Sequence, residues 1–259
     1  MESQFRGEVL IEVRNLSVKY DGFVALESIN FKLEHPSLLV VIGPNGAGKT
    51  TLLKSLLGLL DYSGEIRIFG KEPEDARELI GYMPQRDRVN TNIPLRVKDV
   101  ILMPLLAKRF MSIERADVER AKDALKTVGL PHYWNRKFDA LSGGEQQRIF
   151  LARTLAQNAK ILILDEPFSA TDVATKMKMI NLLHKLKKEK TIILVTHDVN
   201  PLVECTDNFL LLNKRMIAFG RVDEVIREET LEKLYGVRVP VIRKENVCYV
   251  VGSDIHVHH

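Results

Sequence analysis

Residues 38–50 read Leu38-Leu39-Val40-Val41-Ile42-Gly43-Pro44-Asn45-Gly46-Ala47-Gly48-Lys49-Thr50. The first five residues are all apolar, which is typical of a parallel strand buried on both faces. The next eight fit the pattern G-x-x-x-x-G-K-[ST], and residues 51–57, rich in leucine, predict a helix directly after them. A strand, a glycine-rich turn and a helix in this order predict a loop that binds the phosphates of a nucleotide. The alternative, a glycine-rich turn without a ligand, does not explain the Lys-Thr pair.

The chemistry of this loop follows from its residue types. Its glycines let the backbone turn so that several N–H groups point inward, and the following helix adds a partial positive charge at its N-terminus. We expect Lys49 to reach the β- and γ-phosphates of ATP and the hydroxyl of Thr50 to bind Mg²⁺. The predicted nucleotide contacts are Gly43, Pro44, Asn45, Gly46, Ala47, Gly48, Lys49, Thr50 and Thr51.

A second apolar run ends in two carboxylates, in the order Ile161-Leu162-Ile163-Leu164-Asp165-Glu166. An acid at the carboxyl end of a core strand can face the phosphate loop on a neighbouring strand. We expect Asp165 to hold Mg²⁺, directly or through water, and Glu166 to polarise the attacking water as general base. The alternative for either residue is a strand-end acid that faces solvent.

The remaining pattern predicts an α/β fold with a mostly parallel sheet. Apolar residues alternate along the first seventy residues, which predicts an N-terminal antiparallel β subdomain. A third continuous run, Thr191-Ile192-Ile193-Leu194-Val195, predicts another buried strand, and helical spacing lies between the runs. Residues 95–158 are mostly helical in pattern, so we expect a helical subdomain at about 87–158, inserted in a domain of residues 1–240. A tail at residues 241–259 follows.

Bulk properties narrow the class of protein. The net charge of +4 over 259 residues comes with one dense basic run, residues 185–190, which favours a solvated helix end and no nucleic-acid partner. The two cysteines form no CxxC pair, which fits a reducing compartment. No run approaches the roughly 20 apolar residues of a membrane-spanning helix. If the protein acts on a membrane, another chain must cross it.

Several further motifs resemble the ABC family of ATPases. Leu141-Ser142-Gly143-Gly144-Glu145-Gln146-Gln147-Arg148 looks like the ABC signature sequence, and Ser169-Ala170-Thr171-Asp172 resembles the D-loop. Gln85 resembles the Q-loop glutamine, His197 the switch histidine and Tyr20 the aromatic residue that stacks on adenine. The resemblance covers residues of about 9 to 237. It implies a P-loop NTPase core.

The resemblance also implies roles for these residues. In the family the signature contacts the γ-phosphate that the opposite subunit binds, which implies a head-to-tail homodimer with two ATP molecules between the chains. Further nucleotide contacts are then implied for Tyr20, Ser142, Gly143, Gly144, Glu145 and Asp172. The implied catalytic residues are Lys49, Gln85, Glu166 and His197, and the implied Mg²⁺ ligands are Thr50, Gln85 and Asp165. Taken alone, His197 would suit a packing or capping role, and Tyr20 a core or edge-strand role.

Residues 81–86 and 93–103 are similar to the ATPases of zinc and manganese importers, although Pro104 stands where that group usually has glycine. This similarity implies an ATPase on the cytoplasmic face of the cell membrane. It would be bound to an integral membrane permease and served indirectly by an extracytoplasmic substrate-binding protein. Siderophore and haem importers share part of the pattern, and a soluble ABC ATPase in cofactor assembly is a further alternative. His256, His258 and His259 suit metal binding, but equally a flexible or tag-derived end.

Overall fold

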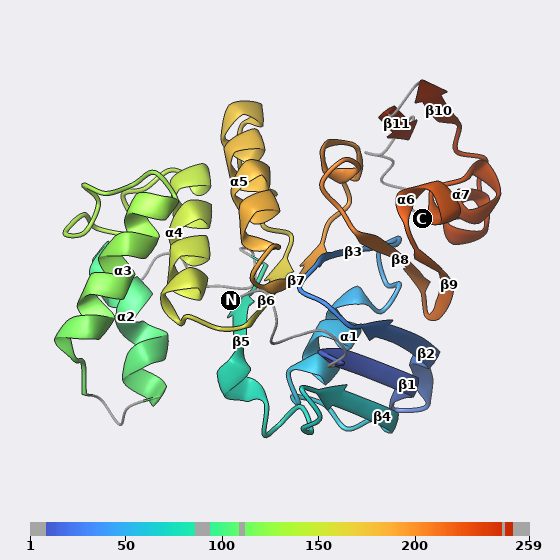
Figure 1. Cartoon of the computed structure of the whole chain (residues 1–259), viewed down its shortest axis with the longest axis horizontal. Helices are drawn as coiled ribbons and strands as arrows, with labels where there is room; N and C mark the ends of the chain where they lie inside the picture. The colour runs from blue at the N-terminus through green and yellow to red at the C-terminus, as the bar shows by residue number, and fades with distance from the viewer. Residues whose placement is uncertain (1–8, 86–93, 109–111, 245–246, 251–259) are drawn as a thin grey trace.

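The computed structural model of this chain describes residues 9–85, 94–108, 112–244 and 247–250 (Figure 1). A six-stranded sheet runs through the middle of the molecule in the order β5-β6-β7-β3-β8-β9. Neighbouring strands are parallel from β5 to β8, and β9 pairs antiparallel with β8. The strands are β5 (Ile80–Met83), β6 (Ile161–Asp165), β7 (Thr191–Val195), β3 (Leu38–Ile42), β8 (Asn208–Asn213) and β9 (Arg215–Gly220).

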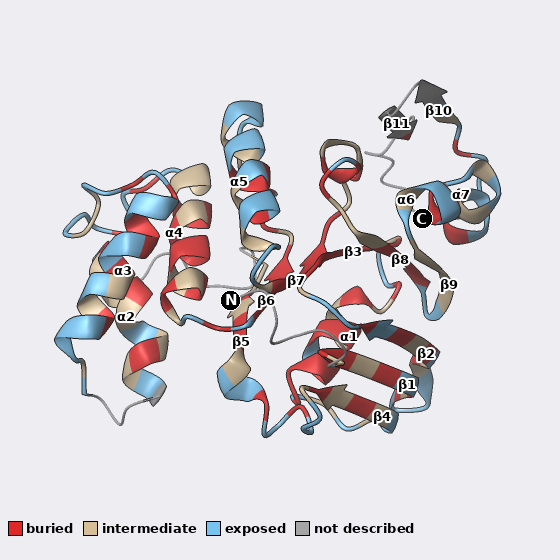
Figure 2. Ribbon diagram, in the orientation of Figure 1, coloured by how far each residue is buried: buried red, intermediate tan, exposed pale blue. Residues whose placement is uncertain are grey.

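The prediction of three fully buried parallel strands is confirmed. Every residue of β3, β6 and β7 is buried, because these strands lie inside the sheet and both sheet faces are covered (Figure 2). The sequence analysis did not predict β8 and β9. The four apolar residues of β8 are also buried, so this strand extends the parallel core by one position.

An antiparallel sheet of β2-β1-β4 covers one side of this core, as predicted. Helix α1 lies between the two sheets, and its leucines pack with residues of both in one apolar cluster. This position explains why Leu52, Leu53 and Leu56 are fully buried. The elements are β1 (Ile11–Tyr20), β2 (Phe23–Leu33), α1 (Lys49–Leu56) and β4 (Ser63–Ile68).

Three helices form a separate group beside β5 and β6 and contact one another (Figure 1). They are α2 (Val97–Lys108), α3 (Arg115–Thr127) and α4 (Gly143–Ala156). A stripe formed by Ala121, Ala124 and Leu125 is buried in α3. Helix α5 (Val173–Leu186) stands between this group and the rest of the core. Within the part of the chain that the structure describes, no helix is both long and apolar enough to cross a membrane.

The C-terminal part begins after β9 and ends in a two-stranded hairpin. Val250 in the last strand is buried in the main core. The side-chain amide of Asn200 donates a hydrogen bond to the backbone carbonyl oxygen of Val250 and accepts one from the N–H group of Val250. The three tail histidines lie outside the described residues. The remaining elements are η1 (Arg77–Leu79), η3 (Asn200–Leu202), α6 (Val222–Val225), α7 (Glu228–Tyr235), β10 (Val241–Lys244) and β11 (Val247–Val250).

Candidate functional site

The phosphate-binding loop connects β3 to α1 and depends on close backbone approaches. A Cβ atom added at Gly43 would lie 2.0 Å from the carbonyl oxygen of Leu212, and one at Gly48 would lie 2.6 Å from that of Ala25. Gly48 also has a φ of 95°, which side chains of L-residues rarely adopt. Glycine is therefore required by space at both positions, and at Gly48 also by conformation.

Lys49 begins α1 and turns back into the loop that precedes it. Its ammonium group donates hydrogen bonds to the carbonyl oxygens of Gly43, at 2.6 Å, and Pro44, at 2.9 Å. Burial lowers the pKa of Lys49 to about 8, although the negative charges of Glu166 and Asp165 oppose that shift. The loop thus encloses a cation near two carboxylates, and an anionic phosphate would favour its protonated form.

The first turn of α1 is suited to an anion. Its N-cap is Gly48, which has no side chain to cap this end of the helix. The hydroxyl-bearing residues Thr50 and Thr51 follow and are both half-buried. An uncapped helix N-terminus presents backbone N–H groups and a partial positive charge, which are the features that phosphate groups require.

Asp165 is the last residue of β6, which pairs directly with β7, and Glu166 follows it. Asp165 is buried, with 2% of its surface exposed. Glu166 follows in a left-handed conformation, with a φ of 49°. One oxygen of its carboxylate, Oε1, lies 2.8 Å from Nε2 of His197, and the other, Oε2, accepts a hydrogen bond of 3.2 Å from Gln85. The structure thus brings together three of the four residues predicted to act in hydrolysis.

The backbone of Glu166 is held by two neighbours. Its N–H group donates to the carbonyl oxygen of Val195 at the end of β7, at 3.0 Å. Its carbonyl oxygen accepts a hydrogen bond of 3.0 Å from the side-chain amide of Gln147 on α4. The sequence analysis assigned no role to Gln147. A signal was available in the helical spacing, because Gln147 lies three residues after Gly144 and so shares its helix face.

The signature residues form the N-terminus of α4. Ser142 is the N-cap and accepts from the N–H of Glu145 at 3.3 Å, while the Glu145 carboxylate accepts from the N–H of Ser142 at 2.8 Å. Tyr133 donates a further hydrogen bond of 2.6 Å to Glu145. That bond, together with the capping bonds, lowers the pKa of Glu145, and it raises the pKa of Tyr133. The Glu145 side chain is therefore occupied within its own subunit.

The other predicted nucleotide residues lie at the ends of their elements. Asp172 is the N-cap of α5 and accepts hydrogen bonds from the backbone and the hydroxyl of Thr175, at 2.9 and 2.8 Å. These bonds lower its pKa. Gly143 begins α4. Tyr20 ends β1 and leaves 42% of its surface exposed, as a residue that stacks on a free base requires.

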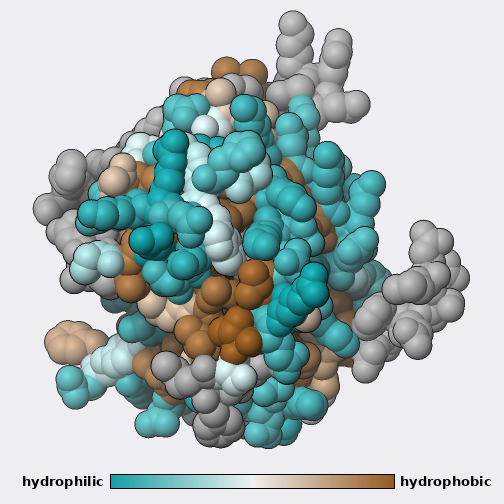
Figure 3. Space-filling view, turned by 90° about the vertical axis from the view of Figure 1, so that its left-hand side faces the viewer, coloured by the Kyte–Doolittle hydropathy of each residue, from teal (hydrophilic) through white to brown (hydrophobic). Residues whose placement is uncertain are grey.

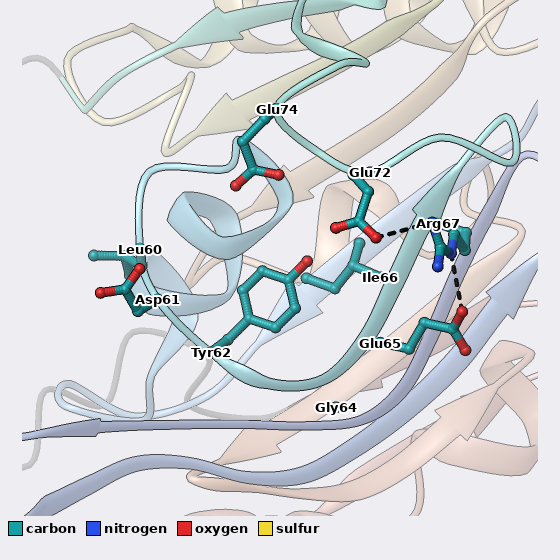
Figure 4. Close-up of a pocket in the computed structure, with 9 residues that line it drawn as sticks. All are labelled: Leu60, Asp61, Tyr62, Gly64, Glu65, Ile66, Arg67, Glu72 and Glu74. Atoms are coloured by element: carbon teal, nitrogen blue, oxygen red, sulfur yellow. Dashed lines mark hydrogen bonds and ion pairs between the residues drawn. The ribbon is translucent and has the colours of Figure 1, made fainter.

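A hollow of about 620 Å³ lies beside β4, away from these motifs (Figure 4). Acidic side chains surround it, but Arg67 pairs with two of them, Glu65 and Glu72, each at 2.9 Å. None of the predicted nucleotide-binding residues lines it. The four residues predicted to act in hydrolysis lie elsewhere, after the carboxyl ends of β3, β5, β6 and β7.

Comparison with known proteins indicates the family to which the chain is similar. Residues 26–169 match the family model of the ABC transporter. The manganese transport system ATP-binding protein MntB of Bacillus subtilis (strain 168) is 43% identical over 237 residues, which cover 90% of this chain and 95% of MntB. The zinc transport system ATP-binding protein TroB of Treponema pallidum (strain Nichols) is 38% identical over 233 residues, with 88% of each chain covered.

Solved structures of ABC transporters are also similar to this chain. An inward-facing ABC transporter assigned to the metal-chelate type superposes with a TM-score of 0.80 at 29% identity, covering 93% of this chain and 96% of that chain. The dimeric structure of the bacterial ABC transporter cassette MJ0796 has a TM-score of 0.73 at 28% identity, covering 82% and 98%. The chain belongs to the ABC transporter family, as an ATP-binding subunit that hydrolyses ATP.

Proposed function

We propose that this chain powers an importer of a divalent metal ion, manganese or zinc. The names of MntB and TroB support this substrate class, as does the sequence similarity at residues 81–86 and 93–103. A siderophore or haem importer is the alternative within the same class of transporter. In each case the substrate passes through other subunits, and this chain supplies the free energy of ATP hydrolysis.

The observation that supports the proposed mechanism of ATP hydrolysis is the position of the Glu166 carboxylate between His197 and Gln85. In this mechanism Glu166 polarises the attacking water and takes up its proton. His197 holds the γ-phosphate and orients the water with Glu166. Lys49 stabilises the charge on the β- and γ-phosphates, and Tyr20 stacks on the adenine ring. The loop from Gly43 to Thr51 supplies N–H donors to the phosphates.

The residues present also suit Mg²⁺. Thr50 offers a hydroxyl oxygen, Asp165 a carboxylate and Gln85 an amide oxygen, and magnesium prefers oxygen ligands of this kind. Asp165 is buried and close enough to Lys49 for its charge to act on the pKa of that residue, so it lies beside the phosphate loop. When bound there, Mg²⁺ would offset the negative charge of the phosphates.

The signature supports a head-to-tail homodimer with ATP between the chains. Ser142, Gly143 and Gly144 open α4, where backbone N–H groups can contact the γ-phosphate bound by the partner subunit. Because the side chains of Glu145 and Asp172 are both engaged in helix caps, we assign their contribution to placing the backbone at this interface. The dimeric cassette among the similar structures supports the formation of a dimer.

The permease would dock on the side of the molecule that carries α2 and Gln85. Figure 3 looks at the molecule from the side of the three-helix group and shows apolar side chains gathered among hydrophilic ones. Met103 of α2 has 41% of its surface exposed. The proposed docking segment, residues 82–110, includes residues 86–93 and 109–110, which lie outside the described residues. The subunit would sit on the cytoplasmic face of the membrane, and the permease would connect it to an extracytoplasmic substrate-binding protein.

Recovery of the tagged chain from detergent-solubilised native membranes tests this function. We expect a multi-spanning permease in the recovered complex and ATP-dependent transport of Mn²⁺ or Zn²⁺ after reconstitution in vesicles. Transport of a siderophore or haem instead would support the role of this chain as a transport ATPase and would contradict a metal ion as the substrate. Recovery of soluble partners alone would reject the transport function and favour a role in cofactor assembly.

A further inference from the structure

Helix α4 approaches the segment after β6 closely along one face. A Cβ atom added at Gly144 would lie 3.2 Å from the carbonyl oxygen of Ala170, which is tighter than an ordinary contact. One helical turn later, Gln147 reaches the carbonyl oxygen of Glu166 at 3.0 Å. Residues three apart share a helix face, so glycine at the first position permits the approach that the second position uses.

The burial of the Gln147 side chain is unfavourable in free energy. The residue is fully buried, with 0% of its surface exposed, and its amide oxygen Oε1 has no hydrogen-bond partner among the described residues. A buried acceptor without a partner costs about 1–3 kcal/mol, so an apolar residue of similar shape, such as methionine, would suit packing alone better. The hydrogen bond to Glu166 is what a glutamine provides at this position and a methionine does not.

That hydrogen bond acts on a backbone conformation that is itself unfavourable. Glu166 has a φ of 49°, and the left-handed region costs a residue with a side chain roughly 1–2 kcal/mol. The N–H group of Glu166 is fixed to Val195. The hydrogen bond from Gln147 fixes the other side of the residue, at its carbonyl oxygen. Together these two bonds determine where the Cα–Cβ bond of Glu166 points.

We infer that Gln147 is a positioning residue that holds the Glu166 carboxylate between Gln85 and His197, and that it links this carboxylate to the signature helix. The inference rests on the proposed role of Glu166 as general base and adds a residue to that site. Gln147 contacts no reacting atom, so its effect passes through the backbone of Glu166. Its removal should therefore lower the rate of hydrolysis and leave the binding of ATP intact.

The test is Gln147→Met in the full-length chain, with Thr154→Val as the control. Thr154 is a buried residue on the same helix beyond the signature, and its hydroxyl donates to a backbone carbonyl, that of Phe150, at 2.9 Å. Single-turnover hydrolysis is counted per mole of bound ATP, so molecules that fail to fold do not contribute. We expect Gln147→Met to slow hydrolysis about 10- to 100-fold, because small misplacements of a catalytic group have effects of this size. The dissociation constant of ATP should change less than about threefold, and Thr154→Val should hydrolyse bound ATP within about twofold of the wild-type rate.

A double variant separates positioning from a structural defect. In the Glu166→Gln background, Gln147→Met should slow residual hydrolysis by less than about twofold, because no carboxylate is left to position. A wild-type rate for Gln147→Met, or equal losses in both backgrounds, would overturn the inference. A wild-type rate for Glu166→Gln would instead overturn the assignment of the general base in the proposed function. These outcomes therefore distinguish failure of the positioning role of Gln147 from failure of the general-base role of Glu166.

Discussion

The Nε2 atom of His197 lies 2.8 Å from the Oε1 atom of Glu166, although the two residues belong to different loops. The contact arises because the loops follow adjacent parallel strands, β6 and β7, whose last residues, Asp165 and Val195, stand in register. Parallel strands place their carboxyl ends at the same edge of a sheet, where ligands of open α/β sheets bind. The pair is therefore positioned by the rigid core.

Glu166→Gln is expected to retain ATP binding and lose turnover by at least about 100-fold, since it removes the general base. The chain should then accumulate as an ATP-bound dimer, which size-exclusion chromatography with light scattering would detect. Glu189→Gln, an exposed change beyond α5, is the control and should leave both properties unchanged. An ATP-dependent dimer that forms in the wild type and is absent in Glu166→Gln would contradict this prediction.

Gly48→Ala should destabilise the fold more than Gly70→Ala. Both glycines have positive φ values, 95° and 73°, so each substitution incurs a strain of roughly 1–2 kcal/mol. A Cβ atom at Gly48 would meet the carbonyl oxygen of Ala25 at 2.6 Å, whereas one at Gly70 has open space around it. We expect an additional loss of about 1–3 kcal/mol for Gly48→Ala, measured by urea denaturation. Equal losses would mean that the close approach has no energetic importance.

Tyr133→Phe should raise the pKa of Glu145, because the hydrogen bond from Tyr133 is the largest cause of its lowered value. A carboxyl group whose pKa is lowered by folding stabilises the folded state above its unfolded value of 4.5. That contribution is lost as the pH falls through the folded-state pKa. The difference in stability between wild type and variant should therefore be largest near neutral pH and vanish in acid. Carbon-13 NMR titration of the Glu145 carboxyl group would measure the pKa directly, and an unchanged value would refute the prediction.

Asn200→Ala should loosen the C-terminal hairpin. The side chain of Asn200 accepts a hydrogen bond from the N–H of Val250 at 2.8 Å and donates one to its carbonyl oxygen at 3.0 Å. Loss of both bonds leaves the edge of β11 without these partners, so hydrogen exchange at Val250 should accelerate about 10-fold or more. Asn213→Ala, which removes a bond to Leu234 elsewhere, is the control. Unchanged exchange at Val250 in the Asn200 variant would show that apolar packing alone holds the hairpin.

The sequence predicted those parts of the fold whose signals are local. The apolar runs of β3, β6 and β7 stand out because strands buried on both faces carry no polar residue. The buried residues of α3 also recur at helical spacing, and Ser142 is a residue type that favours the N-cap it occupies. Strand β8 went unpredicted, although its apolar run is almost as continuous. The sequence predicts a C-terminal tail at residues 241–259, and within it Val250 packs into the main core.

The sequence by itself determined which residue types this protein offers: a phosphate loop, an acid pair, a signature and the residues Gln85 and His197. Only the tertiary structure decided how these residues meet. It places the Glu166 carboxylate between Gln85 and His197, engages Glu145 and Asp172 in caps, and brings Gln147 to the backbone of Glu166. The physical reason is that helix and strand periodicity are set by neighbours along the chain. Contacts between distant loops depend instead on strand order and register, which no local pattern encodes.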